Sequence, residues 1–118
     1  MAFLLLIIEP RGQRDGRTPD EGKQLYADMV RFGEGLAARG VLRASESLRA
    51  DEHGVRVQLH DGKPVLRDGP FIEAKEMVGG FYLLDGVTRD EAVAIAIACP
   101  AAQWASVEVR EIAPCYVK

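Results

Sequence analysis

The segment Asp68-Gly-Pro-Phe-Ile-Glu-Ala-Lys-Glu76 runs almost directly into Gly79-Gly-Phe-Tyr-Leu-Leu84, and these two stretches organise the chain. A tight Asp-Gly-Pro turn opens the first stretch, which carries four ionisable side chains. A Gly-Gly step then leads into an apolar strand. Charged residues on a loop between two rigid pieces of scaffold are typical of binding and catalytic sites. We therefore expect a functional site at residues 68–76.

Two strands are apolar on both faces. Residues 3–8 read Phe-Leu-Leu-Leu-Ile-Ile, and in the strand after the Gly-Gly step Phe81 and Leu83 alternate with Tyr82 and Leu84. A strand with two apolar faces has to be covered on both, which favours a central position in a sheet. This pattern is also the first indication of an oligomer.

Two helix starts carry the same capping signature. Thr18-Pro-Asp-Glu21 and Thr88-Arg-Asp-Glu91 each place a threonine three residues before a glutamate, the spacing of a capping box. Gly40 and Pro100 supply the stops. The apolar residues that we expect to face the core are Leu25, Met29, Phe32 and Leu36 in the first helix and Ala92, Val93, Ala96 and Ile97 in the second.

A hairpin is predicted between the second extended segment, residues 41–49, and the motif. Apolar and polar residues alternate over 55–60, and the following Asp61-Gly62 is a strong signal for a two-residue hairpin turn. That turn places Leu59 opposite Pro64 and Val57 opposite Leu66. Because proline donates no ladder hydrogen bond, the second arm of the hairpin should lie at an edge.

The order of elements is strand, helix, strand with an inserted hairpin, strand, helix, strand. This order predicts a ferredoxin-like α+β sandwich with both helices on one face of the sheet. The other face would carry alternate residues of the two apolar strands, together with Ser106, Glu108 and Arg110 of the last strand, residues 105–112. A soluble monomer does not tolerate an open apolar face of that size. We therefore expect a C2 homodimer that buries this face and encloses a small cavity.

The nonapeptide at 68–76, ahead of Gly-Gly-Phe-Tyr, resembles the DGPF branch of the YCII-related family, and the resemblance extends from Phe3 to Ile112. It implies a dimeric α+β barrel of unsettled chemistry. Members of the family often accompany extracytoplasmic-function sigma factors, which implies a functional link of that kind. A more distant dehydrochlorinase is thought to use a His-Asp dyad with the histidine near the start of the first helix. The helix that begins at Thr18 contains no histidine, so that activity is not carried over.

Composition sets limits on size and partners. With 118 residues, 47% of them hydrophobic, the chain should form a single domain over residues 1–118. A formal net charge of −3 with scattered Lys and Arg offers no basic stripe, so we expect no direct nucleic-acid partner. No stretch has the length of a membrane span, and the apolar start lacks the flanks of a signal peptide.

Cysteine and histidine usage gives further expectations. Cys99 and Cys115 are too few for a disulfide framework, which favours reduced thiols in a cytoplasmic protein. His53 and His60 have no Cys, His or carboxylate at ligand spacing. We therefore expect no metal and no cofactor.

The candidate ligand-binding residues are Asp68, Glu73, Lys75, Glu108 and Arg110. A carboxylate beside a lysine in a partly dry pocket can act as a general base or orient an acidic ligand, because burial and neighbouring charges shift its pKa. Asp68 and Glu73 are the candidate catalytic bases, and Lys75 or Arg110 would hold an anion. In the alternative interpretation Asp68 caps its own turn through an Asx hydrogen bond and Glu73, Lys75 and Glu76 form a solvated face.

Two functions from different classes remain open. One is a small-molecule enzyme of lyase or hydrolase type that uses Asp68 or Glu73 as base. The other is a non-catalytic binding or regulatory module that holds a small acidic or phenolic molecule in the same pocket. The sequence leans toward the second, because it contains no His, Cys or Ser constellation.

Overall fold

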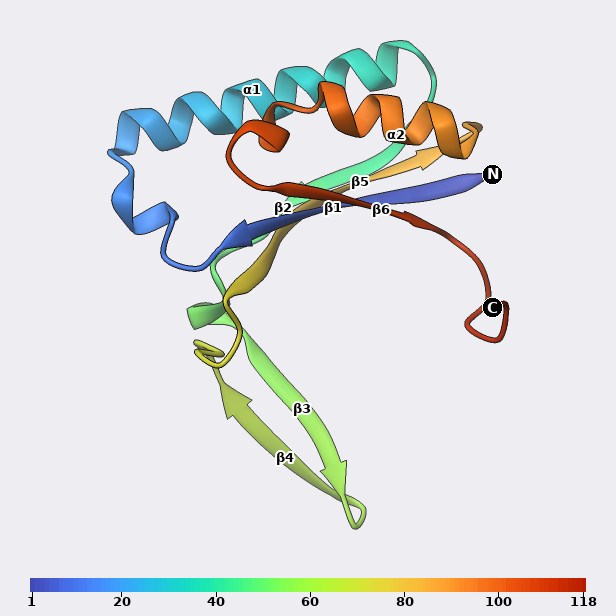
Figure 1. Cartoon of the computed structure of the whole chain (residues 1–118). Helices are drawn as coiled ribbons and strands as arrows, with labels where there is room; N and C mark the ends of the chain where they lie inside the picture. The colour runs from blue at the N-terminus through green and yellow to red at the C-terminus, as the bar shows by residue number, and fades with distance from the viewer.

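The computed structural model describes all 118 residues. Four antiparallel strands form one sheet in the order β2-β5-β1-β6, and both helices cover one face of it (Figure 1). Strands β3 and β4 pair with each other in a separate two-stranded sheet. The elements are β1 Ala2–Pro10, α1 Pro19–Ala38, β2 Leu42–Ser47, β3 Val55–His60, β4 Lys63–Asp68, β5 Glu76–Asp85, α2 Arg89–Ala98 and β6 Ser106–Glu111, with short 3-10 turns at Arg14–Gly16, Asp51–His53 and Pro100–Gln103. The fold is the ferredoxin-like α+β arrangement that the element order predicts.

The helix boundaries confirm the capping prediction. Thr18 and Thr88 each accept a hydrogen bond from the backbone N–H three residues on, and Glu21 and Glu91 bond back to the cap residue. These bonds satisfy N–H groups that the first turn of a helix otherwise leaves without partners. Gly40 follows α1 with φ +75°, a conformation that glycine adopts without strain. Neither helix has the length and apolar content needed to cross a membrane.

The core lies between the helices and the sheet. Phe3, Leu5 and Ile7 of β1 point to this side and are almost fully buried, together with Tyr82 and Leu84 of β5. The Tyr82 hydroxyl donates to the backbone oxygen of Met29 in α1 at 2.6 Å, and burial raises the pKa of Tyr82. The hydrogen bond from Tyr82 to Met29 connects the first helix to the centre of the sheet.

The phase of the second helix differs from the prediction. Ala92, Ile95 and Ala96 are the buried residues of α2, whereas Ile97 is 75% exposed. At 100° per residue, Ile97 lies about 140° around the helix from Ala92, while Ile95 and Ala96 flank it. Short helices rich in alanine and isoleucine present apolar side chains on every side, so their pattern defines the buried face poorly.

The second face of the sheet has no helix over it. The register pairs Leu4 with Arg110, Leu6 with Glu108 and Ile8 with Ser106, so polar residues of β6 lie beside the outward residues of β1 on this face. Phe81 and Leu83 of β5 share it, because they are paired with Leu6 and Leu4. We call this surface, centred on Leu4, Leu6, Ile8, Phe81 and Leu83, the open sheet face.

An ion pair joins the hairpin to the sheet. Arg11, just after β1, donates from Nη1 to Asp51 Oδ1 at 2.6 Å, and its Nη2 bonds to Oδ2. The same guanidinium also donates from Nε to the Ala74 oxygen at 2.8 Å and from Nη2 to the Phe71 oxygen at 3.0 Å. The Phe71 N–H donates to Asp51 Oδ2 at 3.2 Å. One bidentate pair thereby holds the turn before the hairpin and the loop after it in a fixed relation to β1.

The loop of residues 69–75, which we call the motif loop, packs tightly against the same turn. Phe71 is buried, and the guanidiniums of Arg56 and Arg67 lie 3.9 and 5.4 Å from its ring centre. A Cβ on Gly69 would lie 1.8 Å from the backbone oxygen of Asp51, so no side chain fits there. The peptide bond between Gly69 and Pro70 is cis. Through the contacts of Phe71 and Gly69, the motif loop fixes the base of the hairpin against the turn that precedes it.

Replacing Asp51 with Asn should lower the melting temperature at neutral pH and lose that effect in acid. The hydrogen bond from Arg11 lowers the pKa of Asp51, so the folded chain binds fewer protons than the unfolded chain. The stabilisation is complete above the unfolded pKa, about 3.9, and is lost as the pH falls through the lower folded value. Melting curves recorded from pH 7 downward measure the difference in melting temperature between wild type and variant. This difference should become smaller below about pH 4.

The matched control for this prediction is Asp61→Asn at the exposed tip of the hairpin. It should leave the melting temperature unchanged at every pH, because its side chain is almost fully in water. If Asp51→Asn lowered the melting temperature by the same amount at pH 7 and in acid, the ion-pair interpretation would be contradicted.

Candidate functional site

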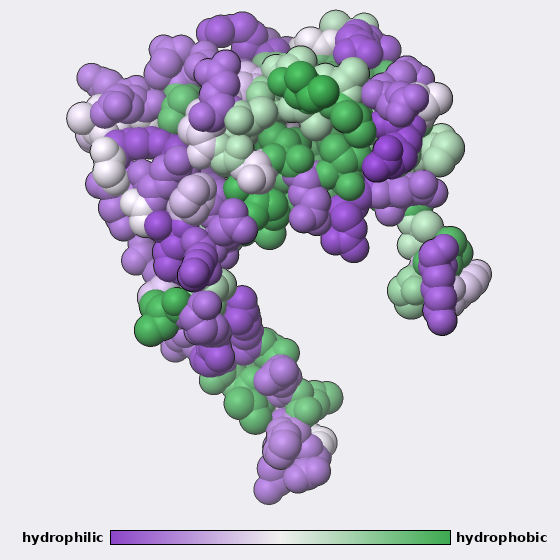
Figure 2. All heavy atoms as spheres, in the orientation of Figure 1, coloured by the Kyte–Doolittle hydropathy of each residue, from purple (hydrophilic) through white to green (hydrophobic).

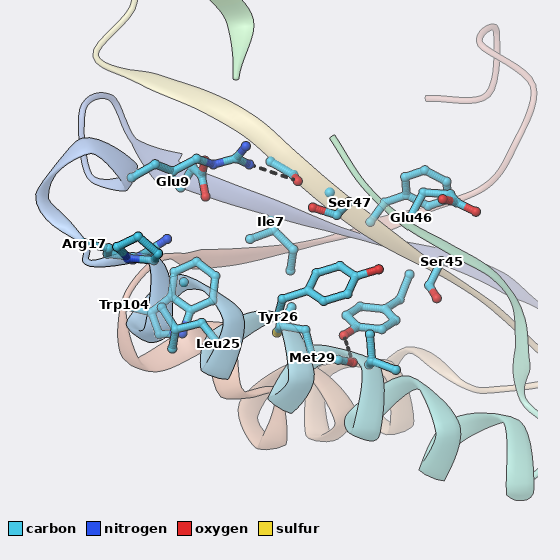
Figure 3. A pocket seen from close by; sticks show the side chains of 18 of the residues that line it. Ile7, Glu9, Arg17, Leu25, Tyr26, Met29, Ser45, Glu46, Ser47 and Trp104 are labelled. Atoms are coloured by element: carbon cyan, nitrogen blue, oxygen red, sulfur yellow. Dashed lines mark hydrogen bonds and ion pairs between the residues drawn. The ribbon is translucent and has the colours of Figure 1, made fainter. Parts of the chain in front are cut away.

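A cavity of about 470 Å³ opens between the first half of α1 and the adjoining ends of β1, β2 and β5 (Figure 3). Its volume is in the range of small-molecule sites, about 300–1,000 Å³. Both polar and apolar side chains line it. The apolar wall is made by Ile7, Leu25, Met29, Val30, Tyr82 and Trp104, and the polar groups by Glu9, Arg14, Arg17, Tyr26, Ser45 and Ser47.

Glycines make room for this cavity. Gly22 lines it from α1, and a Cβ there would meet nothing within 4 Å. On the sheet side, a Cβ on Gly79 would lie 2.8 Å from the Glu9 carboxylate and 2.9 Å from Arg14 Nη2. A Cβ on Gly80 would lie 2.8 Å from the Glu46 oxygen in β2. The Gly-Gly step thus lets β5 pass close to a charged pair and to its neighbouring strand.

That charged pair is Glu9 with Arg14. Glu9 is only 2% exposed, and its Oε1 accepts from Arg14 Nε at 2.5 Å. Arg14 also donates from Nη1 to the Leu48 oxygen at 2.8 Å and from Nη2 to the Gly79 oxygen at 3.4 Å. A buried carboxylate needs such a partner, because an unpaired charge in the interior is strongly unfavourable. Glu9 Oε2 accepts no hydrogen bond from the chain, so it can accept one from a molecule in the cavity.

Trp104 forms an aromatic side of the cavity. The Arg17 guanidinium lies 4.8 Å from its ring centre, and Arg17 Nη2 donates to Gln13 Oε1 at 3.0 Å. Gln13 in turn donates to the Trp104 backbone oxygen at 2.6 Å. These contacts hold the indole ring beside the first turn of α1. The Trp104 Nε1 donor is buried and has no hydrogen-bond partner in the chain.

The charged residues of the motif lie outside the cavity. Glu73 pairs with Arg67 and, at 3.4 Å, with Arg56. Hydrogen bonds from its own backbone N–H and from Arg67 lower the pKa of Glu73, which makes it a weaker base. Asp68 and Lys75 are exposed and form no side-chain hydrogen bond or ion pair. The Asx bond proposed for Asp68 is wrong, since Asp51 is the carboxylate that accepts from Phe71.

The other two candidates form a pair on the open sheet face. Arg110 Nη1 donates to Glu108 Oε2 at 3.2 Å, and both side chains are largely in water. The structure therefore brings Glu108 and Arg110 together, and Glu73 close to two arginines, but it joins neither group to the cavity. No three His, Cys, Asp or Glu side chains gather closely enough to hold a metal ion.

Sequence reasoning missed the residues that do define the cavity. The strand predicted at residues 3–8 stops short of Glu9, yet Glu9 continues the two-residue alternation of Phe3, Leu5 and Ile7 and so belongs to the buried face. That alternation was a usable signal. Arg14 and Trp104 gave no such signal, because they reach the cavity from a 3-10 turn and a connector.

The comparisons with known proteins agree with the fold. Residues 1–115 match the YCII-related domain. A protein of Rhizobium meliloti (strain 1021), named only as uncharacterized, is 41% identical over 93 residues, which cover 79% of this chain and 75% of that protein. The match over nearly the whole length shows that the chain belongs to the YCII-related domain family.

Proposed function

We propose that the chain is a small-molecule-binding module whose ligand occupies the cavity between α1 and the sheet. The observation that carries this proposal is the buried Glu9 carboxylate, which is neutralised by Arg14 and keeps Oε2 without a partner. The cavity combines apolar and aromatic side chains with convergent polar groups, a combination that is typical of ligand sites.

The polar groups favour a phenolic ligand over an acidic one. A phenol O–H can donate to Glu9 Oε2, while its ring packs between apolar side chains and Trp104. A carboxylate ligand would approach Glu9 with like charge, and the charge of Arg14 is already compensated. Arg17, the other cation of the lining, lies over the Trp104 ring and is bonded to Gln13. The proposed ligand is therefore a neutral, aromatic molecule with a hydroxyl group.

The binding role is favoured over the enzyme alternative. Asp68 and Glu73, the bases of that alternative, lie outside the cavity, and the lowered pKa of Glu73 opposes proton abstraction. The resemblance of residues 68–84 to the DGPF branch, and the sigma-factor link that it implies, supports a regulatory use of binding.

Replacing Gly22 with Leu should block the cavity without harming the fold. Leucine would fill space that the glycine leaves open in α1, and leucine favours a helix over glycine by up to ~1 kcal/mol. Trp104 is the only tryptophan, so quenching of its fluorescence by 4-nitrophenol measures occupancy. We expect the dissociation constant to rise about tenfold or more.

Gly35→Leu is the matched control. Gly35 lies in the same helix, also has open space at its Cβ, and does not line the cavity. It should bind 4-nitrophenol as wild type does, while both variants melt no lower than wild type. Equal binding by the two variants would refute the cavity as the site.

A set of matched nitroaromatics tests the ligand chemistry. In mildly acidic buffer, where the phenol keeps its proton, 4-nitrophenol should quench Trp104 at lower concentration than nitrobenzene, and 4-nitrobenzoate should be weakest. Only the phenol has an O–H group that can donate a hydrogen bond to Glu9 Oε2, and the carboxylate of 4-nitrobenzoate would be repelled by the carboxylate of Glu9. Tighter binding of 4-nitrobenzoate than of 4-nitrophenol would show that an acidic ligand is preferred.

We also propose that the chain is a homodimer that buries the open sheet face. Leu6 lies on that face beside Glu108, whereas Leu5 is fully buried beneath the helices. An aspartate at Leu6 should preserve the fold and raise the dimer dissociation constant about a hundredfold or more. Leu5→Asp, the contrasting variant, should prevent folding. Sedimentation equilibrium measures the dimer dissociation constant, and circular dichroism shows whether each variant is folded. An unchanged dissociation constant in Leu6→Asp would exclude this interface.

A further inference from the structure

The hairpin of β3 and β4 stands away from the rest of the molecule (Figure 1). Every residue of both strands is exposed, and the two strands pair only with each other. A two-stranded hairpin alone in water is marginally stable at best. A hairpin of this kind needs a third surface to pack against.

One face of the hairpin is apolar and the other is polar and largely basic. Directly paired residues share a face, so Val57 with Leu66 and Leu59 with Pro64 form the apolar face. Val55 extends this face at the base of the hairpin, where it lies opposite Asp68. Their exposed fractions are 61% and 66% for the first pair and 71% for Leu59. Figure 2 shows hydrophobic side chains along this arm. The opposite face carries Arg56, Gln58, His60, Lys63, Val65 and Arg67. The hairpin therefore has a core-like face with nothing covering it.

The base of the hairpin is fixed, so the arm has a defined direction. The Arg11–Asp51 pair holds the turn before it, and the buried Phe71 lies against Arg56 and Arg67 from its two strands. An arm held in this way presents its apolar face in one orientation, as a docking surface requires.

The whole chain has more surface than a compact monomer of its mass. Its accessible surface is 8221 Å², against about 6,300 Å² expected for a folded 12.9 kDa protein. Its radius of gyration is 16.1 Å, against about 13.5 Å for a compact chain of this length. The excess, about 1,900 Å², exceeds the roughly 800 Å² that each partner buries in a standard interface. The excess surface is therefore large enough for each copy to bury a standard interface.

We infer that the β3–β4 hairpin is an arm that packs its apolar face onto a second copy of this chain. The arm and the C-terminal segment descend from the sheet on its uncovered side, leaving the open sheet face between them (Figure 1). In a two-fold pair, each copy supplies one arm and one such concave surface, so both apolar surfaces are covered by the same contact.

The charges favour this occupant over a lipid surface. The basic residues lie on the face opposite the apolar one, so an arm laid on an anionic membrane would point its cations away from the headgroups. The inference does not depend on the ligand cavity, which lies between α1 and the sheet.

A pair of charge-neutral double variants tests the arm. Val57→Lys with Leu66→Glu replaces one directly opposed pair on the apolar face with an oppositely charged pair, which keeps the hairpin paired while removing its apolar centre. Gln58→Lys with Val65→Glu, the control, introduces the same charged pair at a directly opposed position on the other face. We expect the first double variant to raise the dimer dissociation constant about tenfold or more and the second to leave it unchanged within about threefold.

Sedimentation velocity across a concentration series measures both constants, and melting curves check that the body of each variant is folded. Equal dissociation constants for the two double variants would overturn the arm, as would a wild type that sediments as a 12.9 kDa monomer throughout. Flotation with phosphatidylcholine–phosphatidylglycerol vesicles gives the remaining outcome. Vesicle binding that only the apolar-face variant loses, without a change in dimerisation, would assign the arm to a membrane and overturn the inference.

Discussion

The central strand β1 sets the constraint on which the rest of the molecule depends, because it is apolar at every position from Phe3 to Ile8. Residues that alternate along a strand point to opposite faces, so such a strand requires two covers. The helices supply one, over Phe3, Leu5 and Ile7. The chain supplies no second helical layer, so the other side of the strand lies on the open sheet face.

The same strand explains the cavity between α1 and the sheet. Its inward alternation ends in Glu9, a carboxylate at a position that the pattern reserves for apolar residues. Arg14 neutralises it and glycines at 79 and 80 leave space around it. A buried charge at a position that otherwise carries apolar side chains is unfavourable for stability, and positions of that kind are often functional.

The elements and their order could be read from the sequence, since capping boxes, a two-residue turn and doubly apolar strands are local signals. The buried face of α2 was predicted one position out of phase, because Ile95 and Ile97 are equally apolar and only packing distinguishes them. The site was harder to predict. The motif at 68–76 attracts attention through its charges, yet its main contacts run to Arg11 and Asp51, which lie about 60 and 20 residues away in sequence. Long-range ion pairs of this kind leave no local pattern.

The place where the hairpin joins the sheet has a consequence for how such a chain can evolve. The intervening segment leaves after β2 and returns into β5, and these strands are already neighbours, with Ser47 paired to Gly80 and the Leu48 N–H bonded to the Gly79 oxygen at 2.9 Å. A short turn would close that gap, so the segment can be gained or lost as a unit while the four-stranded sheet keeps its register. Homologues can therefore share this sheet and differ in the arm.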